Sequence, residues 1–296
     1  MGQRPQKTLD KKPREPEFNY PALLFFTPQG VASFGQTQWG RLLIWQGGVA
    51  SLIACSVMLI LSQHWAPVLN EAIEKLPAEG GLNHGNLHWP ENQTGELAGN
   101  HYIEIIINPK KQHQDRNADL KIELLSDRWL VGSIFGFVEF PYPIEQFQVN
   151  RETQIPWWGA RKPFLFIGFS CSIGLAYIAT CLLLGLLGVW PLKAFAFFAD
   201  RVNHFDFLWR LATAAWLPAG TLLAAGSLCY ASGLLILLKL LILTLFCVLV
   251  GILYLFLAGF HLPHTSYSEE NPFNAKEYKD CLGREDDLPS SDNCFD

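Results

Sequence analysis

The chain has 296 residues, of which 50% are hydrophobic and only 17% are charged. A typical soluble domain carries about 25% charged residues, so the composition argues against an ordinary soluble protein and against a disordered one. The net charge of -5 argues against a dedicated nucleic-acid binder, which needs a basic face. The missing charge is concentrated in four segments.

Four long apolar runs account for the low charge. Three of them contain no charged residue, and the fourth contains only Lys239. Each run has 21 to 27 residues, and about 20 are enough to cross a bilayer core. Four transmembrane helices are therefore predicted, over residues 42–62, 164–190, 211–231 and 234–260.

Aromatic and basic residues mark the ends of these runs, as is typical of the headgroup region, where a side chain is half hydrated. Ser232-Gly233 leaves room only for a tight turn, so the last two spans are predicted to form an antiparallel hairpin. Lys239 either extends to the headgroups or faces a polar partner. The predicted membrane-interface residues are Trp157, Trp158, Arg161, Lys162, Trp190 and Lys239.

The distribution of Lys and Arg predicts the orientation. Segment 1–41 carries six of these residues, and loop 191–210 carries three. The positive-inside rule places both segments, and therefore both termini, in the cytoplasm. The first run starts too far along the chain for a cleaved signal peptide and is predicted to be a signal anchor.

The two terminal segments are polar. Tyr20 to Phe26 is predicted either to form a short interfacial helix or to pack beneath the bundle. The tail 261–296 has nine acidic and three basic residues and is predicted to be disordered.

Residues 63–163 are predicted to form a small β-rich extracytoplasmic domain. Asp119 to Leu125 alternates apolar and polar residues, which is typical of a half-buried strand. This segment has no cysteine, so the domain depends on its own core and on contact with the membrane. Further strands, in a mostly antiparallel sheet, are predicted over residues 102–107, 128–131 and 134–140.

The sequence offers few candidate catalytic or metal-binding residues. The predicted spans contain no Asp, Glu or His, and groups of this kind move protons inside membranes. His84 and His88 have a spacing that binds a metal on a helix, but Gly85 and Pro90 argue against a helix there. His84, His88 and His101 are therefore only weak metal candidates, and no catalytic residue, metal or cofactor is predicted.

Small residues recur at helical spacing within the spans, which allows helix backbones to approach closely in lipid. They either pack the bundle internally or form an assembly surface for a protein partner or a second copy. Pro218 is predicted to kink the third span and is a candidate hinge. The predicted helix-packing residues are Gly47, Ser51, Cys55, Ser170, Gly174, Gly220 and Ala224.

Two stretches carry a family resemblance. One is Arg210-Leu-Ala-Thr-Ala-Ala-Trp-Leu-Pro218, and the other is the β-rich insert that opens near Ile73-Glu-Lys-Leu-Pro77. Together with the layout of the spans, they resemble uncharacterised bacterial membrane proteins related to the Yip family, including maltodextrin-utilisation membrane proteins. The resemblance implies an accessory role in a membrane process, no assigned catalytic residue and a bacterial inner membrane.

The sequence therefore predicts an α-helical membrane protein with four transmembrane helices and a β-rich domain between the first two. Its predicted function is that of a non-catalytic accessory, scaffold or sensor subunit that contacts the lipid bilayer and binds no nucleic acid. Two alternatives remain open. One is a channel or transporter component, with Pro218 as hinge and Lys239 near a pore mouth; the other is an extracytoplasmic ligand-binding or metal-dependent module.

Overall fold

The computed structural model describes most of the chain outside the termini. The segment Tyr20 to Phe26, with its two predicted alternatives, lies almost wholly outside the described residues, as does the acidic tail from residue 264 onward. The described residues are 26–77, 80–90, 95–108, 118–142, 147–148, 150–201 and 203–263.

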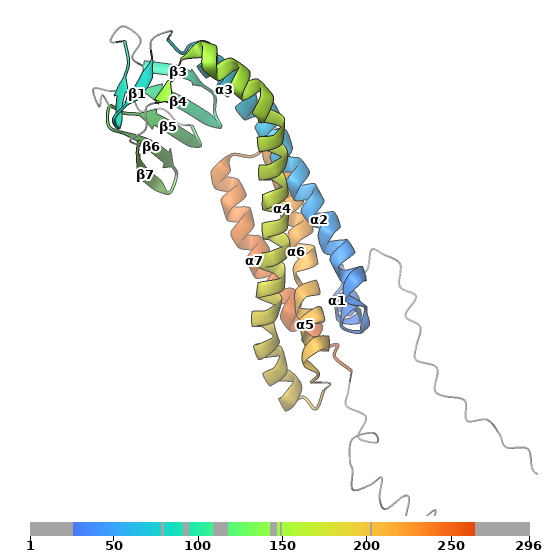
Figure 1. Cartoon of the computed structure of the whole chain (residues 1–296). Coiled ribbons are helices and arrows are strands. Elements are labelled where there is room, and N and C mark those ends of the chain that lie inside the picture. Colours follow the sequence, from blue (N-terminus) through green and yellow to red (C-terminus); the bar gives the residue numbers. More distant parts are fainter. Residues whose placement is uncertain are drawn as a thin grey trace, which may run out of the picture.

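The described chain is mostly helical (Figure 1). Within the described residues, four helices are long and apolar enough to cross a membrane: Trp39–Glu74, Arg151–Phe198, Phe205–Ala231 and Leu237–Gly259. Each overlaps one of the four apolar runs. The elements that form them are α2 (Trp39–Ile60), a π-helical turn (Leu61–Trp65), α3 (Ala66–Glu74), α4 (Arg151–Phe198), α5 (Phe205–Ala214), α6 (Trp216–Ala231) and α7 (Leu237–Gly259).

Three of the four long helices extend beyond the predicted spans, whereas α7 lies within the span predicted for it. α3 and the first turns of α4 occupy both ends of segment 63–163, which was expected to be the β-rich domain alone. α4 starts at a strong N-cap, because the Asn150 side chain accepts a hydrogen bond from the Thr153 amide, 3.0 Å away. It then continues through Pro156 and Pro163, so the segment expected to return the chain to the bilayer is helical.

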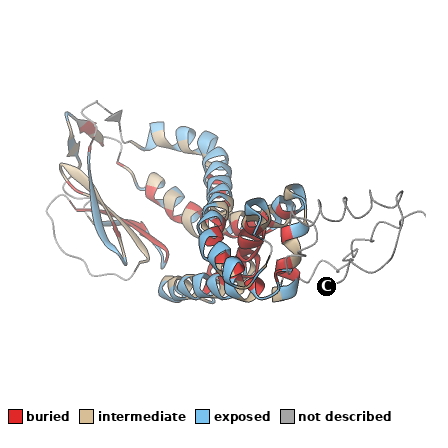
Figure 2. Cartoon of the chain, turned by 90° about the horizontal axis from the view of Figure 1, so that it is seen from below, coloured by how far each residue is buried: buried red, intermediate tan, exposed pale blue. Residues whose placement is uncertain are grey.

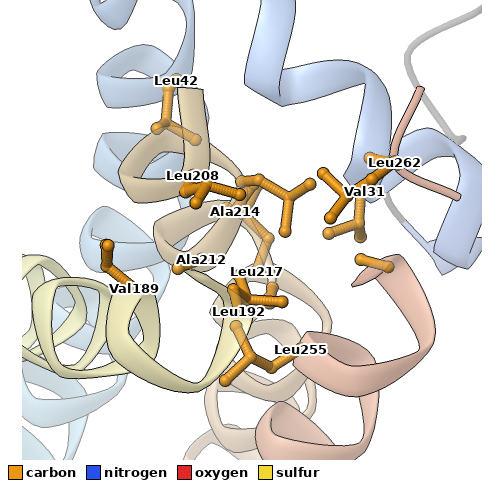
Figure 3. Packing of buried hydrophobic residues seen from close by; sticks show 14 of the residues in the cluster. Val31, Leu42, Val189, Leu192, Leu208, Ala212, Ala214, Leu217, Leu255 and Leu262 are labelled. Atoms are coloured by element: carbon orange, nitrogen blue, oxygen red, sulfur yellow. The ribbon is translucent and has the colours of Figure 1, made fainter. Parts of the chain in front are cut away.

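α5 and α6 form the centre of the bundle. In the most apolar window of Phe205–Ala231, 67% of the residues are buried, against 17–28% for the other three long helices. Figure 2 shows the same contrast, with buried residues at the middle of the bundle and exposed residues on its outer faces. Leu208, Ala212 and Leu217 pack there against side chains from α2, α4 and α7 (Figure 3).

A short N-terminal element closes one end of the bundle. α1 (Pro28–Ser33) and the 3-10 turn η2 (Phe34–Gln36) pack near the C-terminal end of α7 and against α5. Val31 and Leu262 lie close together there and are almost fully buried (Figure 3). The hydroxyl group of Tyr254 also donates a hydrogen bond to the carbonyl oxygen of Phe26, 2.5 Å away.

Two sheets lie at the other end. The larger has the order β3-β4-β5-β6-β7, and the smaller has the order β2-β1-β8. The larger contains the four predicted strands, but β4 and β5 pair in parallel, which alternation alone does not reveal. The strands are β1 (Gly81–Asn83), β2 (Asn86–His88), β3 (Gly95–Gly99), β4 (Ile103–Ile107), β5 (Leu120–Leu124), β6 (Arg128–Ser133), β7 (Gly136–Pro141) and β8 (Phe147–Gln148).

The larger sheet has one fully buried and one fully exposed strand. β4 is fully buried because it lies between β3 and β5 and packs against α3, where Val68 and Ala72 face Ile103 and its neighbours. β7 lies at one edge of the sheet, and every residue of it is exposed. Figures 1 and 2 agree that the sheet lies to one side of the bundle and not over its end.

Candidate functional site

A break in regular helix geometry lies where the first long helix leaves the bundle. Pro67 lacks an amide N–H, and its ring clashes with the carbonyl four residues earlier. The chain passes through a π-helical turn over Leu61–Trp65 immediately before it. Turns of this kind are frequent at functional sites, and this one contains His64.

The last turn of α6 lies beside this π-helical turn. The α6 helix ends in a Schellman motif: the Gly233 amide donates to the Tyr230 carbonyl, and the Leu234 amide donates to the Cys229 carbonyl, each at 3.0 Å. Gly233 has φ +77, which L side chains adopt at a cost. The motif leaves the Ala231 carbonyl available to another donor.

Three hydrogen bonds join the sheet and the π-helical turn to this helix end. His64 donates from Nε2 to the Ala231 carbonyl at 2.7 Å, which assigns the ring a proton on that nitrogen. Tyr102 donates to the Tyr230 carbonyl at 3.1 Å. Tyr230 in turn donates its hydroxyl proton to Asp119 Oδ2 at 2.8 Å.

Asn100 holds the sheet side of this contact in place. Its Oδ1 accepts from the amides of Tyr102 and Ile103, both at 2.9 Å, and its Nδ2 donates to the His64 carbonyl at 2.7 Å. The His64 and Tyr102 rings stack, with centroids 4.0 Å apart. We call the set His64, Asn100, Tyr102, Asp119 and Tyr230 the junction cluster.

The electrostatics of the junction cluster keep Tyr102 in the form that donates a hydrogen bond. Burial, and secondarily the Asp119 carboxylate, raise the pKa of Tyr102, so this phenol stays protonated as a hydrogen-bond donor at neutral pH. The C-terminal end of a helix carries partial negative charge and attracts donors and cations. His64 and Tyr102 therefore cap α6 and hold the sheet against it.

The three candidate metal histidines are not brought together. His84 lies in the turn between β1 and β2 with φ 53, His88 ends β2, and His101 packs its ring edge against Tyr102. Among the described residues, no three His, Cys, Asp or Glu side chains gather so as to hold a metal ion.

The small residues of α4 and α6 face the interior of the bundle. Ser170, Gly174, Gly220 and Ala224 are all buried. A Cβ atom at Gly174 would lie 3.2 Å from the Ala50 carbonyl oxygen, and one at Gly220 would overlap the Tyr177 hydroxyl group. These positions bring α4 close to α2 and to α6.

The small residues of α2 face the other way. Ser51 and Cys55 are exposed, and nothing lies within 4 Å of a Cβ atom built at Gly47. The Ser51 hydroxyl group donates back to the Gly47 carbonyl at 2.8 Å. The stripe Gly47, Ser51 and Cys55 therefore lies on the outer surface of the bundle.

The predicted membrane-interface residues lie in two groups, one in the first turns of α4 and one farther along the chain. Trp157 stacks under the guanidinium of Arg161, 4.8 Å from the ring centroid, while Trp158 donates to Asn70 Oδ1 of α3 at 2.8 Å. Lys162 lies over the Phe166 ring at 6.0 Å. Farther along the chain, Trp190 and Lys239 are exposed on α4 and on the first turn of α7.

The predicted hinge lies next to an irregular turn in the central helix. Pro218 is the third residue of α6, and Ala215, between α5 and α6, keeps a helical backbone with its amide bonded to the Leu211 carbonyl at 3.0 Å. Gln46 of α2 is almost fully buried and donates from Nε2 to the Thr213 carbonyl at 3.1 Å. The irregular turn therefore lies in the bundle interior and is contacted by a side chain of a neighbouring helix.

The junction cluster was not predicted from the sequence. Its hydrogen bonds join residues 111, 128 and 167 positions apart, and no local spacing encodes contacts of that range. The nearest signal is Pro67 at the continuation of an apolar helix, which indicates a disturbed hydrogen-bond ladder close to His64.

Comparisons with known proteins assign the chain to no family. No family model, no curated protein and no solved structure matches the chain.

Proposed function

We propose that the chain is an integral membrane protein of non-catalytic type that acts as an accessory, scaffold or sensor subunit of a membrane process. The observation that carries the proposal is the junction cluster, through which His64, Tyr102 and Asp119 tie the sheet to the last turn of α6. A sheet held in this way has a fixed height and orientation on the membrane. It also contacts the most buried helix of the bundle directly.

The proposed orientation places both termini in the cytoplasm and the sheets on the opposite side. The Lys and Arg residues of segments 1–41 and 191–210 support it. The position of α1 at one end of the bundle and of the sheets at the other is consistent with it (Figure 1). The resemblance to bacterial membrane proteins favours a bacterial plasma membrane.

The proposed partner surface is the stripe Gly47, Ser51 and Cys55 on the outer face of α2. Small residues drive close helix contacts in lipid, and these three are not covered by another described helix of the chain. A second copy or a helix of another membrane protein would complete this contact.

Association of the full-length protein in lipid nanodiscs tests the proposal. Native mass spectrometry is expected to detect a homo-oligomer or a copurified partner, and Ser51→Leu and Cys55→Leu are expected to weaken that complex. Cys171→Leu is the matched control, because Cys171 is an exposed small residue on a different helix, α4. A lone monomer without any partner argues against a scaffold or accessory role.

A channel or transporter component is the second candidate, and the buried polar atoms beside the irregular turn at Ala215 favour it. Polar groups on irregular helices line the sites of many transporters, and within the described residues Gln46 Oε1 and Thr213 Oγ1 are buried without a hydrogen-bond partner. Flux into vesicles tests this candidate. Unchanged flux in both Pro218→Ala and Lys239→Ala would remove the residues that motivate it.

A further inference from the structure

The hairpin formed by β6 and β7 carries an exposed apolar tip. Phe135 is 80% exposed, Phe137 is 71% exposed and Ile134 is 47% exposed. Apolar patches of this kind on a folded protein mark contacts with a protein or a membrane. We call Ile134, Phe135 and Phe137 the hairpin tip.

Charge is segregated along the same hairpin. Arg128 pairs with Asp127 and with Glu139, both at 2.6 Å, at the end where Arg128 lies opposite Pro141. The turn between Ser133 and Gly136 contains no charged residue. The charged groups of the hairpin therefore lie toward the end away from its turn, where Val138 and Phe140 are also exposed, and the turn itself is apolar.

The strand register places the hairpin tip at the end of the sheet that meets α6. One row of paired residues crosses the sheet from β4 to β7: Ile103, Leu120, Ser133 and Gly136. Tyr102 and Asp119, which immediately precede two of these residues, are the groups that contact Tyr230. The hairpin tip thus projects in the direction of the bundle, at the level of the last turn of α6.

The hairpin tip lies beside the bundle and does not lie over it. Neighbouring strands are about 4.8 Å apart, so the three steps from β4 to β7 displace the tip by roughly 14 Å from the Tyr102 contact. Figure 1 shows this hairpin near the level at which α7 begins, and Figure 2 shows the sheet outside the outline of the bundle. The space below the tip is the place of the lipid headgroups if the four helices cross a membrane.

We propose that the hairpin tip inserts into the interfacial region of the bilayer leaflet on the sheet side. Phe and other apolar side chains of membrane-surface elements bury at the boundary between headgroups and acyl chains, and insertion removes the exposed rings from water. The sheet is then attached to the membrane at two points, the junction cluster and the hairpin tip. This inference rests on the proposed membrane insertion of the helices.

Photo-crosslinking of the full chain in vesicles of phosphatidylethanolamine and phosphatidylglycerol tests it. The crosslinker p-benzoylphenylalanine replaces Phe135 at the tip, Glu139 at the charged end, or Leu245, which is 64% exposed in the middle of α7. All three positions are on the surface, so the substitutions leave the core intact. Lipid adducts are identified by mass spectrometry.

The expected result is lipid adducts at Phe135 and Leu245 and roughly tenfold less at Glu139, because a side chain that stays in water meets lipid rarely. Adducts at Leu245 without any at Phe135 would overturn the inference and leave membrane insertion standing. No adduct at Leu245 either would overturn the membrane insertion, and the inference with it. Adducts of Phe135 with a polypeptide would overturn it in favour of a protein interface.

Discussion

The imidazole of His64 donates a hydrogen bond to the carbonyl oxygen of Ala231, 2.7 Å away, across 167 positions of the chain. Ala231 is the last residue of α6, and its carbonyl is one of the groups that a helix end leaves without an internal partner. The contact therefore joins the first long helix, at its π-helical turn, to the end of the central helix. Loss of this hydrogen bond should therefore affect both the π-helical turn and the end of α6.

His64→Ala is expected to loosen the end of α6 and to destabilise the protein by about 1 kcal/mol, since it removes a partly buried hydrogen bond. Hydrogen exchange of the Gly233 and Leu234 amides should rise. His261→Ala is the control, because His261 also bonds a helix carbonyl but is exposed near the other end of the bundle. Equal effects of the two substitutions would contradict a special role of His64.

The junction cluster should weaken at alkaline pH. The pKa of Tyr102 is raised, first by burial and then by the Asp119 carboxylate. A phenol whose pKa is higher in the folded protein than its ordinary value of about 10 contributes stability that is complete below pH 10. That stability is lost as the pH rises through the folded pKa.

Tyr102→Phe isolates this contribution. The groups around Tyr102 that bear charge or titrate are Asp119, His64, His101 and Tyr230, and they remain in the variant. Below pH 10 the wild type should be more stable than Tyr102→Phe, by about 1 kcal/mol for one hydrogen bond. Denaturation in detergent should show this difference shrinking above pH 10; a difference independent of pH would refute the assignment.

Close packing of α4 against α6 gives a prediction about Gly220. A Cβ atom there would overlap the Tyr177 hydroxyl group, so Gly220→Ala should cost about 1–3 kcal/mol through overpacking. Gly47→Ala, on the open face of α2, should be neutral or stabilising, because Ala favours helix. Thermal unfolding of both variants in the same detergent measures the contrast.

The double variant Gly220→Ala/Tyr177→Leu checks the cause. Leu lacks the hydroxyl group and the far end of the ring, so the combined loss of stability should be smaller than the sum of the two single losses. Strictly additive losses would show that Gly220 matters for another reason, such as the 3.0 Å contact that a Cβ atom there would make with Val49.

Charge and hydropathy alone located the four long apolar helices, because a bilayer requires about 20 consecutive apolar residues. The alternation of Asp119 to Leu125 likewise located β5. The continuation of α4 through Pro156 and Pro163 was not predictable in this way, since proline normally ends a helix. The parallel pairing of β4 and β5 also depends on chain paths that side-chain alternation does not encode.

The spacing of small residues indicated close contacts between helix backbones, but not whether each stripe faces the interior or the outside of the bundle. Gly47, Ser51 and Cys55 have the same spacing as buried Gly220 and Ala224, yet they face outward. The direction depends on which helices surround α2, and that is a property of the whole bundle. The junction cluster could not be predicted from the sequence for the same reason. Its two halves meet only once the sheet and the bundle are assembled.

Gly233 gives the last prediction, since its backbone sets the end of α6. Its φ of +77 belongs to the left-handed region, and a Cβ atom there would meet only the Tyr102 hydroxyl group, at the ordinary contact distance of 3.5 Å. The cost of a substitution therefore comes from the backbone and not from crowding. Gly233→Ala should destabilise by about 1 kcal/mol, Gly233→Val by more, and Gly233→Asn by least, because Asn tolerates this conformation.

Thermal unfolding gives the order, and hydrogen exchange at Leu234 shows whether the Schellman bond to Cys229 is lost. If Asn were as costly as Val, side-chain contact with Tyr102 would outweigh backbone strain, and the junction cluster would be more tightly packed than the 3.5 Å approach indicates.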